Sequence, residues 1–345
     1  MDVVKTLEEL TTMYGPSGFE EKVASRVAEL MKPLCDEVKT DSLLNVRGIK
    51  HASVPNAPKL LVSAHTDEIG FMVTRIEDGF LYFRTIGGID PRVLPAREVT
   101  VMTEPPLHGV ITSVPPHLQT PDENKTPFAR EKLCIDVGLS QERAEQLIPI
   151  GTPIGYYDHP QLMQGKYFSS KTLDDRACVV MLMRVLELLK DKQIPVELVV
   201  CASSQEEIGS KGAEVAAYDE APEWAVAVDV THAKTPDSGS AVSIEFGKGV
   251  PVATGPNATR KLSKRLCAIC DEIGVGSQLE VIAGHSGTDA WEMQVVGDGS
   301  ASGVLSLPLR YMHTATEMIC LEDLEAGAKL IAAFAENPYG EGGNK

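Results

Sequence analysis

The alternation of apolar strands with helices, broken by a stretch of different pattern, most constrains the fold of this 345-residue chain. Helical spacing of apolar residues, or short apolar runs bounded by turn residues, predicts each element. The expected helices span 2–13, 19–34, 172–191, 209–218, 258–273 and 321–337, and the expected strands span 41–49, 59–73, 195–207, 224–233, 278–283 and 302–309. This alternation is typical of an α/β domain in which helices sandwich a mostly parallel sheet.

Residues 70–165 interrupt this alternation. Their apolar runs are short and are broken by glycine and proline, which predicts a small all-β module. We therefore expect one α/β domain built from residues 1–69 and 166–345, with residues 70–165 inserted into it as a β domain.

The charge balance limits the partners of this chain. It carries 49 acidic and 32 basic residues, for a formal net charge of −17. Such a surface repels nucleic acids and anionic membranes, so we expect neither as a partner. No apolar run approaches the roughly 18 residues that a membrane span needs. The seven cysteines are an odd number in a chain too long to need disulfides, so we expect a cytoplasmic protein.

Two pairs of polar residues are candidates for a metal site. His65 and Asp67 lie two apart at the end of an apolar strand, and a metal-binding histidine commonly gives its other ring N–H to a carboxylate. A structural histidine paired with an aspartate would give the same pattern. Asp174 and Asp175 precede an apolar helix. Helix capping explains one of them, whereas two adjacent carboxylates repel each other unless a cation is near.

Three further candidates follow later strands. Glu206 and Glu207 leave an apolar strand together, where one can act as a general base and the other as a metal ligand, although a solvated turn is the alternative. Asp229 ends an apolar strand and needs a cation or loop amides. His313 follows the last long strand and would be unremarkable alone. Histidine and carboxylate ligands at one sheet edge suit zinc, cobalt or manganese, and hydrolysis is the usual chemistry.

Six motifs in sequence order carry a resemblance to a known family. HTDEIG, LDDRAC, QEEIGSKGA, AVDVTHA, SGTDAW and RYMHT resemble the M42 family of di-metal aminopeptidases, which includes glutamyl and leucyl aminopeptidases that form tetrahedral particles. Some members are labelled endoglucanase M. The resemblance implies two divalent metal ions per subunit, Zn²⁺ or Co²⁺ with Mn²⁺ as an alternative. It also implies short peptides with a free N-terminus as substrates. The inserted domain would be PDZ-like and would build a homododecamer from dimers.

The resemblance also implies a ligand set. His65 and Asp229 would bind one metal ion, Glu207 and His313 would bind the other, and Asp174 would bridge the two.

The same resemblance implies the remaining roles near the metals. Glu206 would be the general base that takes the proton of the attacking water, and Asp67 would orient His65. A cis peptide bond is expected between Asp174 and Asp175.

Four residues are candidates for the substrate pocket because they lie in or near the last motifs. They are Thr288, Asp289, His285 and Arg310. For the Asp289 turn, capping of the next helix is an equal interpretation.

Three other functions remain open at this point. A related di-metal carboxypeptidase or deacylase shares the bridging aspartate and the paired glutamates. A glycosidase would need two carboxylates that flank a sugar bond and no histidine–metal cluster, and an aromatic content of only 5% argues against it. A non-catalytic peptide-binding scaffold would require the ligand set to have decayed.

Overall fold

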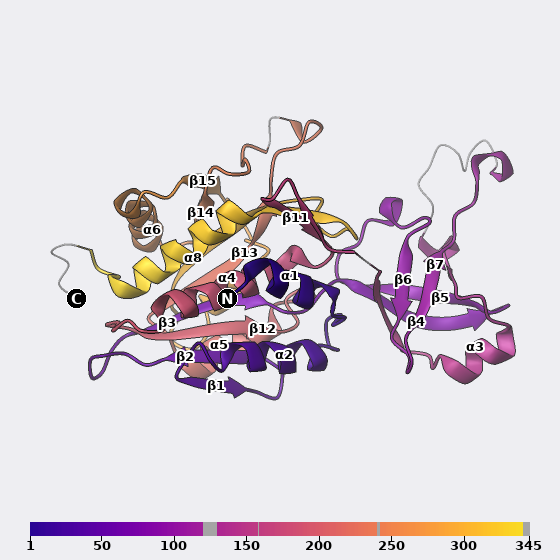
Figure 1. Ribbon diagram of the computed structural model, residues 1–345, viewed down its shortest axis with the longest axis horizontal. Coiled ribbons are helices and arrows are strands. Elements are labelled where there is room, and N and C mark those ends of the chain that lie inside the picture. Colours follow the sequence, from indigo (N-terminus) through magenta and orange to yellow (C-terminus); the bar gives the residue numbers. More distant parts are fainter. Residues whose placement is uncertain (120–129, 158, 240–241, 341–345) are drawn as a thin grey trace.

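The structure is a computed structural model that describes residues 1–119, 130–157, 159–239 and 242–340. A large sheet covered by helices makes up most of it, and a closed barrel lies at one end (Figure 1). The helices of the large part are α1 (Val3–Thr12), α2 (Glu21–Met31), α4 (Leu173–Leu189), α5 (Lys211–Glu220), α6 (Arg260–Ile273), α7 (Ala290–Met293) and α8 (Leu321–Glu336). None of the helices in these described ranges has the length and apolar character to cross a membrane.

The large sheet contains eleven strands. Nine follow one path, in the order β1 (Glu37–Thr40), β2 (Val46–Lys50), β12 (Glu197–Ser203), β3 (Lys59–His65), β13 (Trp224–His232), β16 (Ala301–Arg310), β17 (Glu317–Cys320), β11 (Tyr167–Ser170) and β10 (Gln161–Met163). Two more lie off this path, with β14 (Val250–Thr254) beside β16 and β15 (Ser277–Val281) beside β14.

The parallel part of the sheet is its centre. The strands β12, β3, β13 and β16 run parallel to their neighbours in that order. The flanking strands β1 and β2 on one side and β17, β11 and β10 on the other pair antiparallel. The sheet, expected to be mostly parallel, is therefore parallel only at its centre. Strands from distant parts of the chain, such as β2 with β12 and β11 with β17, also pair antiparallel.

Helices cover both faces of this sheet. Along β3, Leu60, Val62 and Ala64 pack into one apolar cluster with residues of α1, α2, α4, α6 and α8, while Leu61 packs into another with α5 and α7. Because side chains alternate across a strand, each central strand supplies both layers. Helix α4 is buried over most of its length in the middle of the first layer, which explains its apolar run over residues 177–183.

The inserted segment forms the barrel. Its strands close in the order β4 (Gly70–Glu77), β5 (Phe80–Ile86), β8 (Ile135–Asp136), β7 (Leu107–Ile111), β6 (Glu98–Val101) and β9 (Pro153–Tyr156), around an apolar core of their own. Short 3₁₀ turns span Pro91–Val93, Pro116–Leu118 and Arg130–Lys132.

Two details of the inserted segment differ from the sequence expectation. It includes one helix, α3 (Gln141–Leu147), whose first turn is capped by Ser140, so the module is not entirely β. Strand β10, placed by sequence in the inserted segment, pairs with β11 in the large sheet. The domain boundaries at 69/70 and 165/166 stay a prediction.

Two expected strands are divided in the structure. The apolar run 59–73 is not one strand, because β3 ends at His65 in the large sheet and β4 begins at Gly70 in the barrel. The run 41–49 also contains a turn, because the Asp41 carboxylate accepts hydrogen bonds from the main-chain N–H of Leu43 and Asn45. Apolar pattern alone does not distinguish one buried strand from two that enter different cores.

Truncation of the central helix should weaken the fold. Leu182 lies on α4 and is fully buried, so Leu182→Ala should lower the free energy of unfolding by about 2–5 kcal/mol. Denaturant unfolding followed by circular dichroism measures this loss. Tyr218→Ala is the control, since Tyr218 is 72% exposed and its loss should change stability by about 0.5 kcal/mol or less. Equal effects of the two substitutions would contradict the assigned core.

Candidate active site

Polar side chains gather at the ends of the central parallel strands. His65 is the last residue of β3, Asp229 lies near the end of β13, and His313 follows β16. Glu206 and Glu207 stand in the turn after β12. Since parallel strands end at the same edge, residues far apart in sequence meet there. The barrel lies beyond this end of the sheet, toward which β12 runs (Figure 1).

Asp174 lies between two imidazole rings. Its Oδ1 is 3.2 Å from His65 Nε2, and its Oδ2 is 3.2 Å from His313 Nε2. His313 Nε2 is also 3.3 Å from Glu207 Oε1. One carboxylate thus faces both histidines with a different oxygen, which is the arrangement that a bridging ligand requires.

The other ring nitrogen of each histidine is bound to a main-chain carbonyl. His65 Nδ1 donates to the Asp67 carbonyl at 3.1 Å, and His313 Nδ1 donates to the Gly88 carbonyl at 2.7 Å. These bonds place a ring proton on Nδ1 in both rings. Each Nε2 faces Asp174 and donates its own proton there in the metal-free protein, and it would become a metal ligand once that proton is lost.

The Asp67 side chain fixes the turn that carries the two glutamates. Its carboxylate accepts hydrogen bonds from the main-chain N–H of Glu206 at 3.0 Å and of Glu207 at 3.1 Å, and from Ser17 Oγ at 2.6 Å. Its Oδ1 also lies 3.4 Å from His65 Nδ1. Asp67 thus holds one histidine and both glutamates in position.

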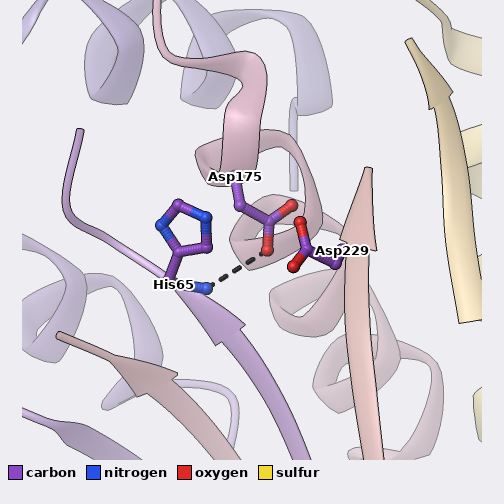
Figure 2. Close-up of side chains that lie close together, drawn as sticks. All are labelled: His65, Asp175 and Asp229. Atoms are coloured by element: carbon purple, nitrogen blue, oxygen red, sulfur yellow. Dashed lines mark hydrogen bonds between the residues drawn. The ribbon is translucent and has the colours of Figure 1, made fainter. Parts of the chain in front are cut away.

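A second group of candidate ligands lies beside the first. One ligand atom each from His65, Asp175 and Asp229 lies within 4.8 Å of the others, and the same holds for His65, Asp174 and Glu207. Figure 2 shows the carboxylates of Asp175 and Asp229 facing each other, and the main-chain N–H of His65 donates to Asp175 Oδ2 at 3.1 Å.

The pair of aspartates on α4 suits a cation. The peptide bond between Asp174 and Asp175 is cis, as the resemblance implies. Asp175 Oδ1 is buried and has no hydrogen-bond partner among the described residues. A buried carboxylate oxygen without a donor is costly, and a cation bound nearby would offset that cost. The residues present therefore fit a divalent metal centre.

Burial of so much negative charge shifts the pKa of the acids. Burial raises the pKa of Glu206 to about 10, and it also raises the pKa of Glu207 and, strongly, the pKa of Asp229 and Asp175. For His313, burial acts to lower the pKa, but hydrogen bonds to the Asp174 and Glu207 carboxylates raise it to about 11. Without metal, these buried acids and His313 thus retain protons, and bound metal ions would supply the positive charge in their place.

Two buried cations behind the cluster are engaged elsewhere. Lys171 Nζ lies 2.7 Å from Glu68 Oε2, and Arg176 Nη2 lies 3.3 Å from Glu68 Oε1. Arg176 also donates to the main-chain carbonyls of Thr66 and Met13. The cationic partners that reach Asp174 and Glu207 are histidines.

A cavity of about 350 Å³ opens onto the cluster. It is lined by Gly88, Asp174, Glu206, Glu207, Gly209, Ser210, Asp229, Val230, His285, Gly287, Glu292, Met312 and His313. Of the four pocket candidates from the sequence, His285 lines this cavity. Asp289 is buried under the sheet, where its Oδ2 accepts hydrogen bonds from Ser63 and Ser203.

The other two pocket candidates make contacts of their own. Thr288 is buried and its hydroxyl bonds to Ser286. Arg310 donates to the Lys234 carbonyl, and its guanidinium lies 4.3 Å from the centre of the Phe246 ring.

Three residues hold the site residues in position through hydrogen bonds but were not identified from the sequence. They are Ser17, Gly88 and Glu317. The carboxylate of Glu317 accepts hydrogen bonds from the main-chain N–H of Asp174 at 3.0 Å and of His313 at 2.9 Å, and burial strongly raises its pKa. Glu317 opens the apolar strand β17, so the argument applied to Asp229 would have detected it.

The comparisons with known proteins agree with this site. The sequence profile of the M42 glutamyl aminopeptidase family matches residues 45–330. A lysyl aminopeptidase of Pyrococcus furiosus is 35% identical over 328 residues, which cover 93% of each chain. An aminopeptidase structure from the archaeon Desulfurococcus kamchatkensis superposes with a TM-score of 0.90 at 33% identity, over 97% of this chain and 94% of that chain. The structure of the TET1 peptidase of Pyrococcus horikoshii superposes with a TM-score of 0.86 at 33% identity, over 97% of this chain and 100% of that chain. That peptidase can assemble into a tetrahedron or a large octahedral shell.

Fold, site and likenesses together define a hydrolase of the aminopeptidase class. Within that class, the chain belongs to the M42 peptidase family, whose profile covers most of its length. The resemblance carried by the six motifs is confirmed, and so is the fold class, a helix-covered sheet with an inserted barrel.

The metal-free protein should lose stability as the pH rises. Groups with a raised folded pKa, such as Glu206 and His313, stabilise the fold below their unfolded pKa, and this contribution is lost as the pH rises through the folded pKa. Burial acts to raise the pKa of Asp174, but its histidine partners lower it below the usual value. Asp174 therefore makes stability fall with falling pH only under strongly acidic conditions. We expect the melting temperature of chelator-treated protein to fall between about pH 5.5 and about pH 8.5.

Added Zn²⁺, Co²⁺ or Mn²⁺ should reverse this trend, because metal ions bind the deprotonated ligands. The stabilisation by metal, measured as a shift in melting temperature, should therefore grow with pH. Asp174→Asn is the control and should abolish most of the metal-dependent shift. A chelated protein that melts higher at the alkaline end would contradict the electrostatic account.

Proposed function

We propose that this protein removes the N-terminal residue of short peptides that have a free N-terminus, by water attack at a two-metal centre. The observation that carries the proposal is the Asp174 carboxylate, which presents one oxygen to His65 Nε2 and the other to His313 Nε2. Two divalent ions bound there would polarise the scissile carbonyl and lower the pKa of the attacking water.

The proposed ligands are those that the family resemblance implies. His65 and Asp229 hold one ion, Glu207 and His313 hold the other, and Asp174 is shared. Support comes from the short distances among these side chains and from the Nδ1 bonds that leave both Nε2 atoms free to bind metal. Zn²⁺ or Co²⁺ is the proposed metal, with Mn²⁺ as the alternative, since His, Asp and Glu ligands suit all three.

Glu206 is the proposed general base. Its carboxylate lines the cavity, and Oε2 lies 3.9 Å from His65 Nε2, beside the metal ligands but bound to neither histidine. Burial alone would raise the pKa of the Glu206 carboxyl group, and bound metal ions nearby would lower it again. Glu206 then accepts the proton of the attacking water at a carboxylate oxygen and delivers it to the leaving amine. The Asp67 carboxylate positions Glu206 by accepting a hydrogen bond from the main-chain N–H of Glu206.

The barrel and the cysteines support two proposals about the whole protein. We propose a homododecamer built from dimers, to which the inserted domain, residues 70–165, contributes contacts. The similar TET1 peptidase assembles into a tetrahedron or an octahedral shell. We also propose a cytoplasmic location, since all seven cysteines are free, as a reducing compartment would keep them.

Replacing the base should separate catalysis from metal binding. Glu206→Gln preserves size but cannot accept the proton, so kcat should fall by about 10²–10⁴-fold while metal content stays at the wild-type level. Turnover of an aminoacyl 4-nitroanilide and metal analysis by plasma mass spectrometry measure the two quantities. The matched control is Glu8→Gln on the exposed face of α1, which should retain wild-type kcat. Near wild-type turnover by Glu206→Gln would show that another group is the base.

The requirement for a free N-terminus distinguishes this function from the related carboxypeptidases and deacylases. Wild-type enzyme loaded with each metal in turn should cleave a free-amine peptide and leave its N-acetylated form intact. Activity should disappear with a chelator and return with metal. Faster cleavage of the acetylated peptide would reject the aminopeptidase assignment.

A further inference from the structure

One carboxylate in the cavity wall has no part in the proposed metal centre. Glu292 lies on α7 and lines the cavity that also contains Glu206 and Asp229. It is half-buried, and its carboxylate makes no hydrogen bond or ion pair within the described ranges. In the proposal above, Asp229 and Glu207 are metal ligands and Glu206 is the general base, whereas Glu292 has no role.

The fold holds α7 in a fixed position. Asp289, directly before the helix, is anchored under the sheet by the hydroxyls of Ser63 and Ser203, at 2.6 and 2.7 Å. Ala290 and Met293 are fully buried in the apolar layer that α7 shares with α5. With those two residues packed inward, Glu292 is left on the side of the helix that borders the cavity.

The charges of the cavity wall favour a cation beyond the metals. Five carboxylates line the cavity, from Asp174, Glu206, Glu207, Asp229 and Glu292. Two divalent ions would supply four positive charges, so one negative charge remains. No lysine or arginine occurs among the lining residues in the described part of the chain.

A histidine also stands in the outer wall. His285 Nδ1 accepts a hydrogen bond from the main-chain N–H of Gly287 at 2.9 Å. The ring also stacks on Trp291 with centroids 4.2 Å apart, which fixes its orientation. An acidic side chain of the substrate would meet no lysine or arginine among the described residues of this wall.

Two apolar residues complete the pocket. Val230 follows Asp229 on β13, and Met312 precedes His313. A long aliphatic stem can pack on such residues while its charged end reaches a polar group. Lysine and arginine have this form. The net charge of −17 would also draw cationic peptides toward the protein.

We propose that Glu292 is a specificity-determining residue that binds the cationic side chain of an N-terminal lysine or arginine. The substrate class is then peptides with a basic N-terminal residue. This inference rests on the proposed aminopeptidase function and adds to it the choice of residue, which the sequence alone left open. A charge-assisted hydrogen bond between the Glu292 carboxylate and the substrate ammonium or guanidinium supplies the discrimination.

The test compares substrates whose N-terminal side chains are cationic, neutral or anionic. The metal-loaded enzyme is assayed with lysyl, norleucyl and glutamyl 4-nitroanilides, and kcat/KM is measured for each. Wild-type enzyme should prefer lysyl over norleucyl by about tenfold or more, the scale of one hydrogen bond to a charged group. Glu292→Gln should bring this ratio close to one, mainly through KM of the lysyl substrate. Glu292→Lys should favour glutamyl over lysyl.

The control and the outcomes separate this proposal from the function on which it rests. Glu8→Gln removes the same charge from an exposed site on α1 and should keep the wild-type ratio. A wild-type ratio near one, a glutamyl preference, or an unchanged ratio in Glu292→Gln would overturn the role of Glu292, while the cleavage itself would still support the aminopeptidase. If none of the aminoacyl substrates is cleaved with any of the three metals, the proposed function fails and this inference fails with it.

Discussion

The burial of several carboxylates at one sheet edge is the constraint on which the rest of this structure depends. Folding brings Asp174, Asp175, Glu207 and Asp229 into contact range of two histidines and raises the pKa of most of these acids. Such a cluster persists only because the surrounding fold is strong. The four parallel strands, the buried helix α4 and the Glu68 ion pairs supply that strength. The buried carboxylates thus lower the free energy of unfolding, and the apolar layers offset this loss.

The carboxylate of Asp67 holds the backbone of two candidate site residues in place. Two hydrogen bonds to it, from the main-chain N–H of Glu206 and Glu207, fix the turn after β12, and a third comes from Ser17. Glu207 contacts His313, Glu206 lies nearer His65, and both line the cavity. Adjacent residues can therefore have different chemical roles without a long loop between them.

Much of this arrangement could be predicted from the sequence, because apolar runs that end in His, Asp or Glu have few structural explanations. His65, Glu207, Asp229 and His313 were noticed in that way, and Asp174 was noticed by its place before an apolar helix. Their ligand roles came from the family resemblance, and the five residues lie together. The parts that escaped depend on contacts across long separations. The Glu317 and Ser17 hydrogen bonds join segments that no local pattern relates, and the division of the run 59–73 depends on which core each half enters.

The hydrogen bond from His313 to Gly88 links residues 225 positions apart and joins the barrel segment to the reactive centre. Gly88 also forms part of the cavity wall. The inserted module is therefore not an appendage that could be excised to leave a minimal enzyme. Its removal would take away the carbonyl that sets the tautomer of one histidine. The barrel segment and the large sheet therefore both contribute groups to the proposed site.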